Sequence, residues 1–247
     1  MKAWALGTGG WIPTEERETI CVLLREGDDA LLLDAGSGLR RLVGKPALLD
    51  GVCRLDVALT HFHLDHVCGL GYVPALPLVP TVWAPGRWLY GTSSAELLDP
   101  LRRAPLSPFE PAELGEVREL VDGPQSIGRF EVAARAQPRH WAPTAGLRVA
   151  AALALVTDTA YDPESAAFAR GVVHLLHEAW STSDEPVATE GDATAAEAGR
   201  VAHDAGVRHL TLVHLDPRAP DEAALLADAR RLFPAAQLGR DLAPLAL

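Results

Sequence analysis

Short apolar segments, each closed by Gly, Asp or Thr, recur along the first sixty residues. They cover residues 3–6, 20–24, 30–33 and 57–59. Aliphatic runs of this length between turn-forming residues are typical of buried strands, and they are too short for ordinary helices. The pattern therefore predicts a β-sheet built early in the chain.

The remainder of the chain alternates between strand-like and helix-like patterns. Strands are predicted at residues 130–134, 172–176 and 210–213, with a hairpin joining 147–151 to 154–156. Helical spacing covers residues 95–103, 194–205 and 221–232. We therefore expect two face-packed sheets covered by helices, an α/β sandwich. No repeat, low-complexity tail or charge block marks a boundary, so residues 1–247 are expected to form a single domain.

Composition narrows the class of protein. The chain has 247 residues, of which 48% are hydrophobic, enough for a large core. Its formal net charge of -11 disfavours extended nucleic acid as a partner. No apolar run approaches the roughly 18 residues of a membrane span, and the first residues leave no room for a signal peptide. We expect a soluble, cytoplasmic protein with no membrane partner.

The cysteines do not suggest a disulfide framework. Cys21, Cys53 and Cys68 are widely spaced, odd in number and form no CxxC pair. Such cysteines are expected to be reduced thiols and not zinc ligands.

Three histidines and an aspartate within six positions form the strongest chemical signal. The run His61-Phe62-His63-Leu64-Asp65-His66 directly follows the strand predicted at 57–59. If it is a turn leading into a helix at Val67, His61 and His63 point toward one metal ion, and Asp65 and His66 toward a second. Packing alone rarely concentrates imidazoles in this way, so the run predicts a two-metal site.

Further ligands are expected at later strand ends, because side chains on loops held by a rigid sheet can converge. Three polar residues each end an apolar strand, namely His140, Asp158 and His214. Three other histidines lack this placement and are not expected to be ligands, namely His174, His203 and His209.

Taken together, these motifs resemble those of the metallo-β-lactamase superfamily. The matching features are the HxHxDH run, Asp34 in a Leu-Asp-Ala-Gly turn, His140, the Thr157-Asp158-Thr159 turn and His214. The resemblance implies an αββα sandwich, in which two mixed β-sheets pack face to face between helices. It also implies two divalent metal ions, with Zn²⁺ as the usual occupant and Mn²⁺ or Fe²⁺ as alternatives that suit the same ligands.

The family pattern gives each ligand a role. One metal is expected to bind His61, His63 and His140, the other Asp65, His66 and His214, with Asp158 bridging both. Asp65 is also counted among the catalytic residues. Asp34 resembles the aspartate that braces the ligand loop, although a turn-capping role before Gly36 is the alternative. Two neighbouring cations would activate a bridging hydroxide, so we expect a metal-dependent hydrolase.

Later segments resemble the ribonuclease Z and phosphodiesterase branch of this superfamily. The likeness lies in His177-Glu178-Ala179-Trp180, residues 194–198 and Leu212-Val213-His214, and it implies phosphodiester hydrolysis. Ribonuclease Z proteins that process tRNA carry a long arm between the positions of His140 and Asp158, where this chain has only 17 residues. We therefore expect a small anionic substrate, such as a cyclic nucleotide or nucleotide derivative, and no tRNA or long nucleic acid.

The general acid is left open by this pattern. Where the family usually has a histidine, this chain has Asp192, which is either an acid or a helix N-cap. His177 is the second candidate, beside Glu178, which could orient it.

Other residues near the expected cleft are weaker candidates for substrate contact. Arg139 and Arg148 could meet an anion, and Trp11, Trp141 and Trp180 could meet a flat group or simply pack in the core.

Two other functions remain open at this stage. The same hydroxide could hydrolyse a lactone or a thioester. Alternatively, the protein could keep the fold and metal as a non-catalytic accessory protein, a hypothesis that Asp192 motivates. A homodimer is also compatible with the sequence.

Overall fold

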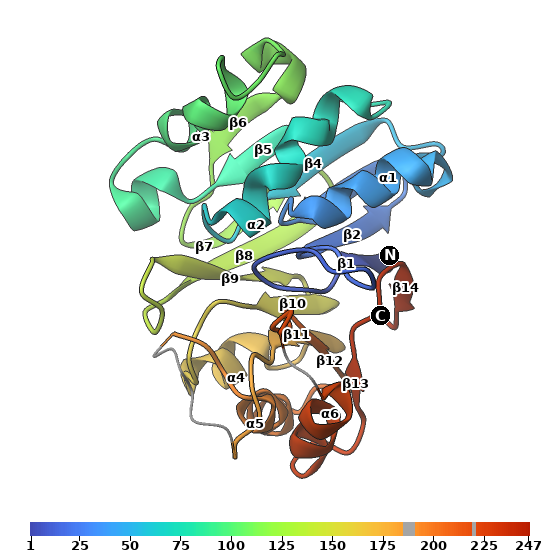
Figure 1. Ribbon diagram of the computed structural model, residues 1–247, viewed down its shortest axis with the longest axis vertical. Helices are drawn as coiled ribbons and strands as arrows, with labels where there is room; N and C mark the ends of the chain where they lie inside the picture. Colours follow the sequence, from blue (N-terminus) through green and yellow to red (C-terminus); the bar gives the residue numbers. More distant parts are fainter. Residues whose placement is uncertain (185–190, 219–220) are drawn as a thin grey trace.

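Two β-sheets packed face to face form the centre of the molecule (Figure 1). The structure is a computed structural model that describes residues 1–184, 191–218 and 221–247, and within them each sheet has seven strands. The first sheet has the order β14-β1-β2-β3-β4-β5-β6, and the second the order β13-β12-β11-β10-β9-β8-β7.

The strands of the first sheet are β1 (Lys2–Gly7), β2 (Cys21–Glu26), β3 (Asp29–Leu33), β4 (Arg54–Ala58), β5 (Thr81–Ala84), β6 (Glu116–Glu119) and β14 (Ala243–Leu245). Those of the second are β7 (Gly123–Ile127), β8 (Phe130–Gln137), β9 (Thr144–Val149), β10 (Leu153–Val156), β11 (His174–Glu178), β12 (His209–Val213) and β13 (Ala236–Leu238).

Helices cover the outer face of each sheet. They are α1 (Arg40–Gly44), α2 (Leu64–Val67), α3 (Ser94–Arg102), α4 (Glu164–Ala169), α5 (Ala195–Ala205) and α6 (Glu222–Arg230). Further helical segments of other types are η1 (Ser37–Leu39), η2 (Pro46–Leu49), η3 (Cys68–Ala75), η4 (Gly86–Tyr90) and η5 (Pro111–Leu114). In the described parts of the chain, none of the helices combines the length and apolar character needed to cross a bilayer.

Both sheets are mixed. In the first, β3, β4, β5 and β6 run parallel, while β1, β2 and β14 pair antiparallel. In the second, β10 to β13 run parallel and β7 to β10 pair antiparallel. Parallel strands deliver their carboxyl ends to one edge of a sheet, which is where polar loops can gather.

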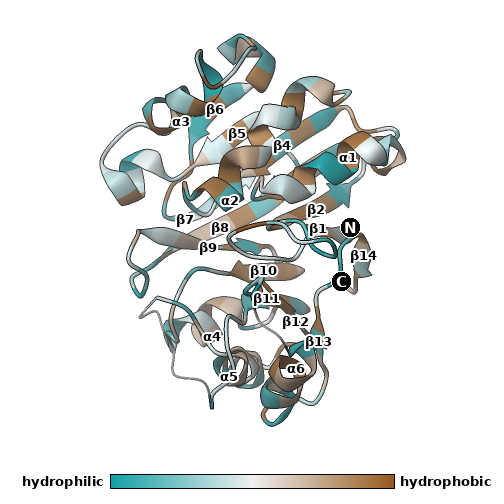
Figure 2. Ribbon diagram, in the orientation of Figure 1, coloured by the Kyte–Doolittle hydropathy of each residue, from teal (hydrophilic) through white to brown (hydrophobic). Residues whose placement is uncertain are grey.

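Three buried apolar clusters account for the layers. One lies between the sheets and includes Leu33 and Leu155 from opposite sheets. A second packs the outer face of the first sheet beneath α1 and α3, and a third packs the second sheet beneath α4, α5 and α6. Figure 2 shows hydrophobic residues gathered on the central strands and mixed hydropathy along the helices. The expected αββα sandwich of two mixed sheets is confirmed.

Element boundaries differ from the predicted ones where turns intervene. The strand predicted at 147–151 spans Thr144–Val149, because Ala150 has a positive φ of 46° in a turn. The strand predicted at 172–176 begins only at His174. The sequence pattern missed short strands such as β5 and β6, which have four residues each and are not continuous apolar runs.

The buried His174 predicts a pH dependence of stability. Its Nδ1 donates to the Ala246 carbonyl at 2.9 Å, its Nε2 lies 2.7 Å from Thr211 Oγ1, and burial lowers its pKa to about 4. In the unfolded chain His174 has a pKa of about 6.5 and is protonated below this pH, whereas in the folded chain it stays neutral down to about pH 4. Acidification below pH 6.5 therefore favours unfolding.

We expect the stability advantage of the wild type over His174→Asn to shrink by roughly 2 to 3 kcal/mol between pH 7.5 and 4.5. Urea unfolding at several pH values measures it. The matched control is His203→Asn, whose side chain is 69% exposed, and its difference from the wild type should change far less between the two pH values. An advantage of wild type over His174→Asn that does not change with pH would contradict the prediction.

Candidate metal centre

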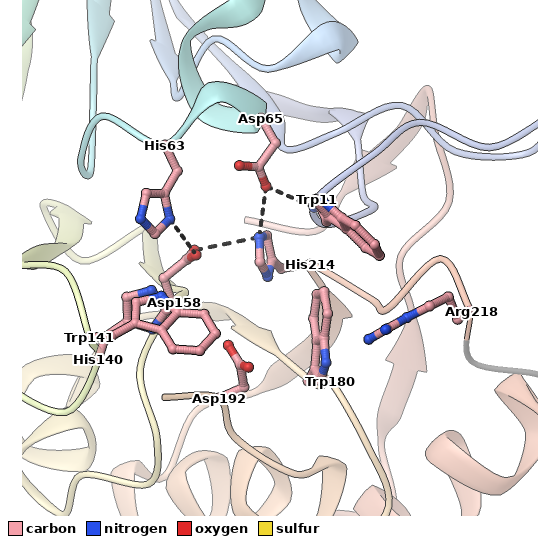
Figure 3. A pocket seen from close by; sticks show the side chains of 10 residues that line it. All are labelled: Trp11, His63, Asp65, His140, Trp141, Asp158, Trp180, Asp192, His214 and Arg218. Atoms are coloured by element: carbon pink, nitrogen blue, oxygen red, sulfur yellow. Dashed lines mark hydrogen bonds and ion pairs between the residues drawn. The ribbon is translucent and has the colours of Figure 1, made fainter. Parts of the chain in front are cut away.

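Residues from several strand ends meet at one edge of the two sheets. The histidine run follows β4, and His140, Asp158 and His214 follow β8, β10 and β12. Figure 3 shows five of these side chains facing a common pocket. The helix in the run begins at Leu64, with His63 as its N-cap, and not at Val67 as predicted. Asp65 and His66 are therefore carried by the first turn of α2.

Asp158 presents its two carboxylate oxygens to different sets of histidines. Oδ1 lies 3.6 Å from His61 Nε2 and 3.9 Å from His63 Nδ1. Oδ2 lies 3.2 Å from His66 Nε2 and 3.6 Å from His214 Nε2. The carboxylate thus lies between two clusters of imidazole nitrogens.

The second of these clusters includes Asp65. Its Oδ2 lies 3.3 Å from His214 Nε2 and 3.5 Å from His66 Nε2, and the two imidazole nitrogens are 3.3 Å apart. One oxygen and two nitrogens within this range form a compact donor set of the kind that binds zinc.

Among the residues that the structure describes, three overlapping sets of donor atoms each fall within 4.8 Å of one another. They are His63 with His140 and Asp158, Asp65 with His66 and His214, and His61 with His66 and Asp158. The second set matches the predicted grouping. The donor atom of His61 lies within 4.8 Å of those of His66 and Asp158. The prediction groups His61 with His63 and His140 instead, so His61 lies nearer the middle of the cluster than predicted.

Partners behind the ligands fix the orientation of the rings. His66 Nδ1 donates to Asp34 Oδ2 at 2.9 Å, and Asp34 also accepts hydrogen bonds from the backbone N and Oγ1 of Thr60. His140 Nδ1 donates to the Gly191 carbonyl at 2.9 Å. Each bond occupies one ring nitrogen and directs the other, Nε2, into the site. Asp34 therefore ties Thr60, the residue before the histidine run, to His66 at its end.

Glu178, which ends β11, has the same relation to His214. It is fully buried, and its Oε2 lies 3.6 Å from His214 Nδ1. From its place in the sequence, Glu178 could have oriented His177. Successive residues of a strand point to opposite faces, so Glu178 faces the site while His177 faces away from it.

The electrostatics of the cluster favour cations. Burial lowers the pKa of His66, but Asp158 and two further carboxylates outweigh it and raise the pKa to about 10. The pKa of His214 is also raised against the effect of burial, mainly by Asp158. Burial, together with the neighbouring imidazoles of His66 and His63, lowers the pKa of His61, and Asp158 and Asp65 only partly offset this. Carboxylates that hold protons on buried imidazoles this strongly create a potential that equally suits divalent metal ions.

Several buried nitrogen atoms in the site have no hydrogen-bond partner among the described residues. They include His61 Nε2 and His140 Nε2. Buried polar atoms are nearly always paired, so orphaned imidazole nitrogens that face carboxylates indicate a ligand. The residues present therefore fit a binuclear metal centre.

The backbone is strained at the same place. Asp34, Asp158, His214 and Trp11 all have positive φ values, between 49° and 60°. Non-glycine residues rarely adopt this conformation, and when they do they gather at functional sites.

A cavity of about 290 Å³ opens over the cluster (Figure 3). Its lining comprises Trp11, His63, Asp65, His140, Trp141, Asp158, Trp180, Asp192, His214 and Arg218. Of the two candidate acids, the lining includes Asp192. The N-cap of α5 is Thr194, whose Oγ1 accepts from the Glu197 backbone N–H, so Asp192 is not needed as a cap.

His177 is not brought into this cavity by the structure. It is 1% exposed, its Nδ1 donates to the Glu178 carbonyl, and burial lowers its pKa to about 4. Its side chain points to the same face of β11 as that of Leu175, which belongs to the apolar cluster beneath the helices. A side chain on that face cannot protonate a group bound in the cavity.

The two arginines predicted to contact an anion do not line the cavity. Arg148 donates to the carbonyls of Ala150, Phe168 and Arg170, which makes it structural, and the exposed Arg139 is not part of the lining. Arg218 lines the cavity instead. No local pattern marked Arg218, because it stands four residues beyond His214 in an irregular segment.

Comparison with known families accounts for this combination of fold and cluster. Residues 30–215 match the model of the beta-lactamase superfamily domain. The chain belongs to the metallo-β-lactamase superfamily. It is a hydrolase of this superfamily, and its His/Asp cluster is suited to divalent metal ions.

Within this superfamily the chain is similar to ribonuclease Z proteins. It is 31% identical to the ribonuclease Z of Methanopyrus kandleri over 277 aligned positions, covering 96% of this chain and 94% of the relative. The alignment is longer than the chain itself, so the relative contains segments that this chain lacks.

Solved structures of the superfamily share the fold. The metallo-beta-lactamase fold protein YhfI from Bacillus subtilis superposes with a TM-score of 0.80 at 20% identity, covering 99% of this chain and 98% of the other. A diphosphatase from the PhnP family superposes with a TM-score of 0.75 at 16% identity, covering 100% and 97%.

Proposed function

We propose that this chain hydrolyses a small phosphodiester, such as a cyclic nucleotide or a nucleotide derivative, with the help of two divalent metal ions. The proposed metal ligands are His61, His63, Asp65, His66, His140, Asp158 and His214. Zn²⁺ is the proposed ion, with Mn²⁺ and Fe²⁺ as alternatives for the same donors. The observation that carries the proposal is the Asp158 carboxylate, whose two oxygens face different histidines at 3.2 to 3.9 Å.

Such ions, when bound, would lower the pKa of a water molecule and offset the charge that builds on a phosphoryl group. The protein's own residues position the reactants. Asp158 spans both halves of the site, while Asp34 and the Gly191 carbonyl hold the rings of His66 and His140 in place. Because these rings are held in place, the ligands do not have to reorient as charge develops in the transition state, as expected of a preorganised site.

Asp192 is the proposed general acid. It lines the cavity, it is 7% exposed, and it follows Gly191, whose carbonyl accepts from His140 (Figure 3). A protonated carboxyl at this position would give its proton to the leaving oxygen as the ester bond breaks. We propose Asp65 as a metal ligand that also orients the attacking water, because its carboxylate faces the same cavity.

A small substrate is favoured over tRNA by the segment between His140 and Asp158. Those residues form only the short loop before β9, the strands β9 and β10, and the tight turn that joins them. The net charge of -11 also opposes binding of a long polyanion. The proposed partner is thus a small anion, and the proposed location is the cytoplasm.

The experiment is a substrate panel of bis-p-nitrophenyl phosphate, an aliphatic lactone and a thioester, assayed before and after removal of metal by a chelator. We expect turnover of the phosphodiester, its loss on chelation, and its return on adding Zn²⁺, Mn²⁺ or Fe²⁺. Metal-dependent turnover of the lactone or the thioester, with none of the phosphodiester, would overturn the proposal.

A further inference from the structure

Three of the six tryptophans surround the candidate metal centre. Trp4, Trp83 and Trp88 pack against the apolar clusters of the core. Trp11, Trp141 and Trp180 line the cavity instead, where Trp11 is 53% and Trp141 68% exposed. Large aromatic surfaces left in water at the mouth of a pocket mark a place where a ligand binds.

The pocket tryptophans are held by the candidate ligands themselves. Trp180 packs against His214 with ring centroids 5.6 Å apart and an interplanar angle of 33°, and Trp141 packs against His140 at 5.0 Å. The backbone N–H of Trp11 donates to Asp65 Oδ2 at 2.8 Å. The ring contacts hold Trp180 and Trp141 beside the cluster, and the hydrogen bond of Trp11 fixes its backbone there, which reduces the entropy lost when a flat group binds.

Arg218 adds a cation to one of these walls. Its guanidinium carbon lies 5.0 Å from the ring centroid of Trp11, a cation–π distance. Its Nε and Nη2 donate to the two carboxylate oxygens of Asp216 at 2.9 and 2.8 Å. Two of the five guanidinium N–H groups are therefore used, and within the described part of the chain the other three remain as donors. Among the described residues of the lining, Arg218 is the one arginine or lysine.

We infer that Trp11, Trp180 and Arg218 form a nucleotide-binding wall. The base of the substrate stacks against the indoles, and Arg218 donates to an anionic oxygen of the same molecule. The inference rests on the proposed phosphodiesterase function and narrows its substrate class to diesters that carry a nucleobase. Aromatic stacking accepts every base, so the wall selects nucleotides over sugar or alkyl phosphates without reading the identity of the base.

A binding experiment on the metal-loaded protein separates the two contributions. Isothermal titration compares adenosine 5′-monophosphate with ribose 5-phosphate, which has the same phosphate and no base. We expect the nucleotide to bind about tenfold more tightly, and Trp11→Ala to remove most of this margin. Trp11→Phe should retain part of it, because a smaller ring still stacks. Arg218→Gln should weaken the binding of both ligands.

The matched control is Arg200→Gln. Arg200 makes the same kind of contact outside the cavity, with its guanidinium carbon 5.4 Å from the Tyr161 ring and an ion pair to Asp204. Its replacement should change neither affinity. The inference would be overturned if the wild type bound both ligands equally tightly. It would also be overturned if Trp11→Ala kept the same preference for adenosine 5′-monophosphate over ribose 5-phosphate.

A parallel assay separates this inference from the proposed function. Thymidine 5′-p-nitrophenyl phosphate and methyl p-nitrophenyl phosphate share a leaving group and differ in the nucleoside. A higher kcat/KM for the thymidine ester, reduced toward that of the methyl ester in Trp11→Ala, supports the nucleotide wall. Equal turnover of both esters contradicts the wall and leaves the proposed function standing, whereas turnover of neither contradicts the proposed function.

Discussion

Replacing Asp158 by asparagine is expected to lower kcat/KM for bis-p-nitrophenyl phosphate about a thousandfold. The substitution keeps the size of the side chain but turns one acceptor oxygen into an NH₂ group and removes the negative charge. Both halves of the site lose a shared partner, since Oδ1 faces His61 and His63 while Oδ2 faces His66 and His214. The measurement is steady-state kinetics with a parallel count of bound metal per chain.

The matched control is Asp56→Asn. Asp56 is as buried as Asp158 and ion-paired with Arg54, but it lies within β4, away from the edge where the histidine run begins. Its loss should reduce stability and leave metal content unchanged. Wild-type activity in Asp158→Asn would show that this carboxylate is not shared by two metal ions.

Replacing Asp192 by asparagine should lower kcat by about a hundredfold to ten-thousandfold for diesters with poor leaving groups. The amide cannot supply a proton to an alkoxide, although it occupies the same space in the lining. The effect should largely vanish for p-nitrophenol, which leaves without help. A plot of rate against leaving-group pKa should therefore be steeper in the variant than in the wild type.

This dependence distinguishes an acid from a residue that merely shapes the cavity. A structural role would slow all substrates by a similar factor, whatever their leaving group. Equal slopes for Asp192→Asn and the wild type would exclude Asp192 as the proton donor.

Much of the fold could be predicted because its central strands are continuous apolar runs. β2, β3 and β12 are buried on both faces, and such strands differ plainly from their surroundings. The strands at the edges of the sheets were harder to predict from the sequence. β13 and β14 are three residues long, and β7 contains a glycine, a proline and two polar residues. Local pattern says little about segments that become strands only by pairing with a neighbour.

Most of the candidate site was predictable for a different reason. Its ligands are either adjacent in sequence or stand directly after apolar strands, so their convergence follows from the sheet. The face of β11 to which the His177 side chain points could not be predicted from the sequence. All five residues of β11 are buried, so no alternation of polar and apolar positions reveals which face each side chain takes. Arg218 was missed because its role depends on Trp11, far away along the chain.

The most direct test of the two-metal site is anomalous diffraction from crystals of the protein grown with Zn²⁺. We predict two peaks roughly 3.5 to 4 Å apart on either side of the Asp158 carboxylate, each within about 2.0 to 2.2 Å of its nitrogen and oxygen ligands. A single peak, or peaks that Asp158 does not touch, would contradict the account.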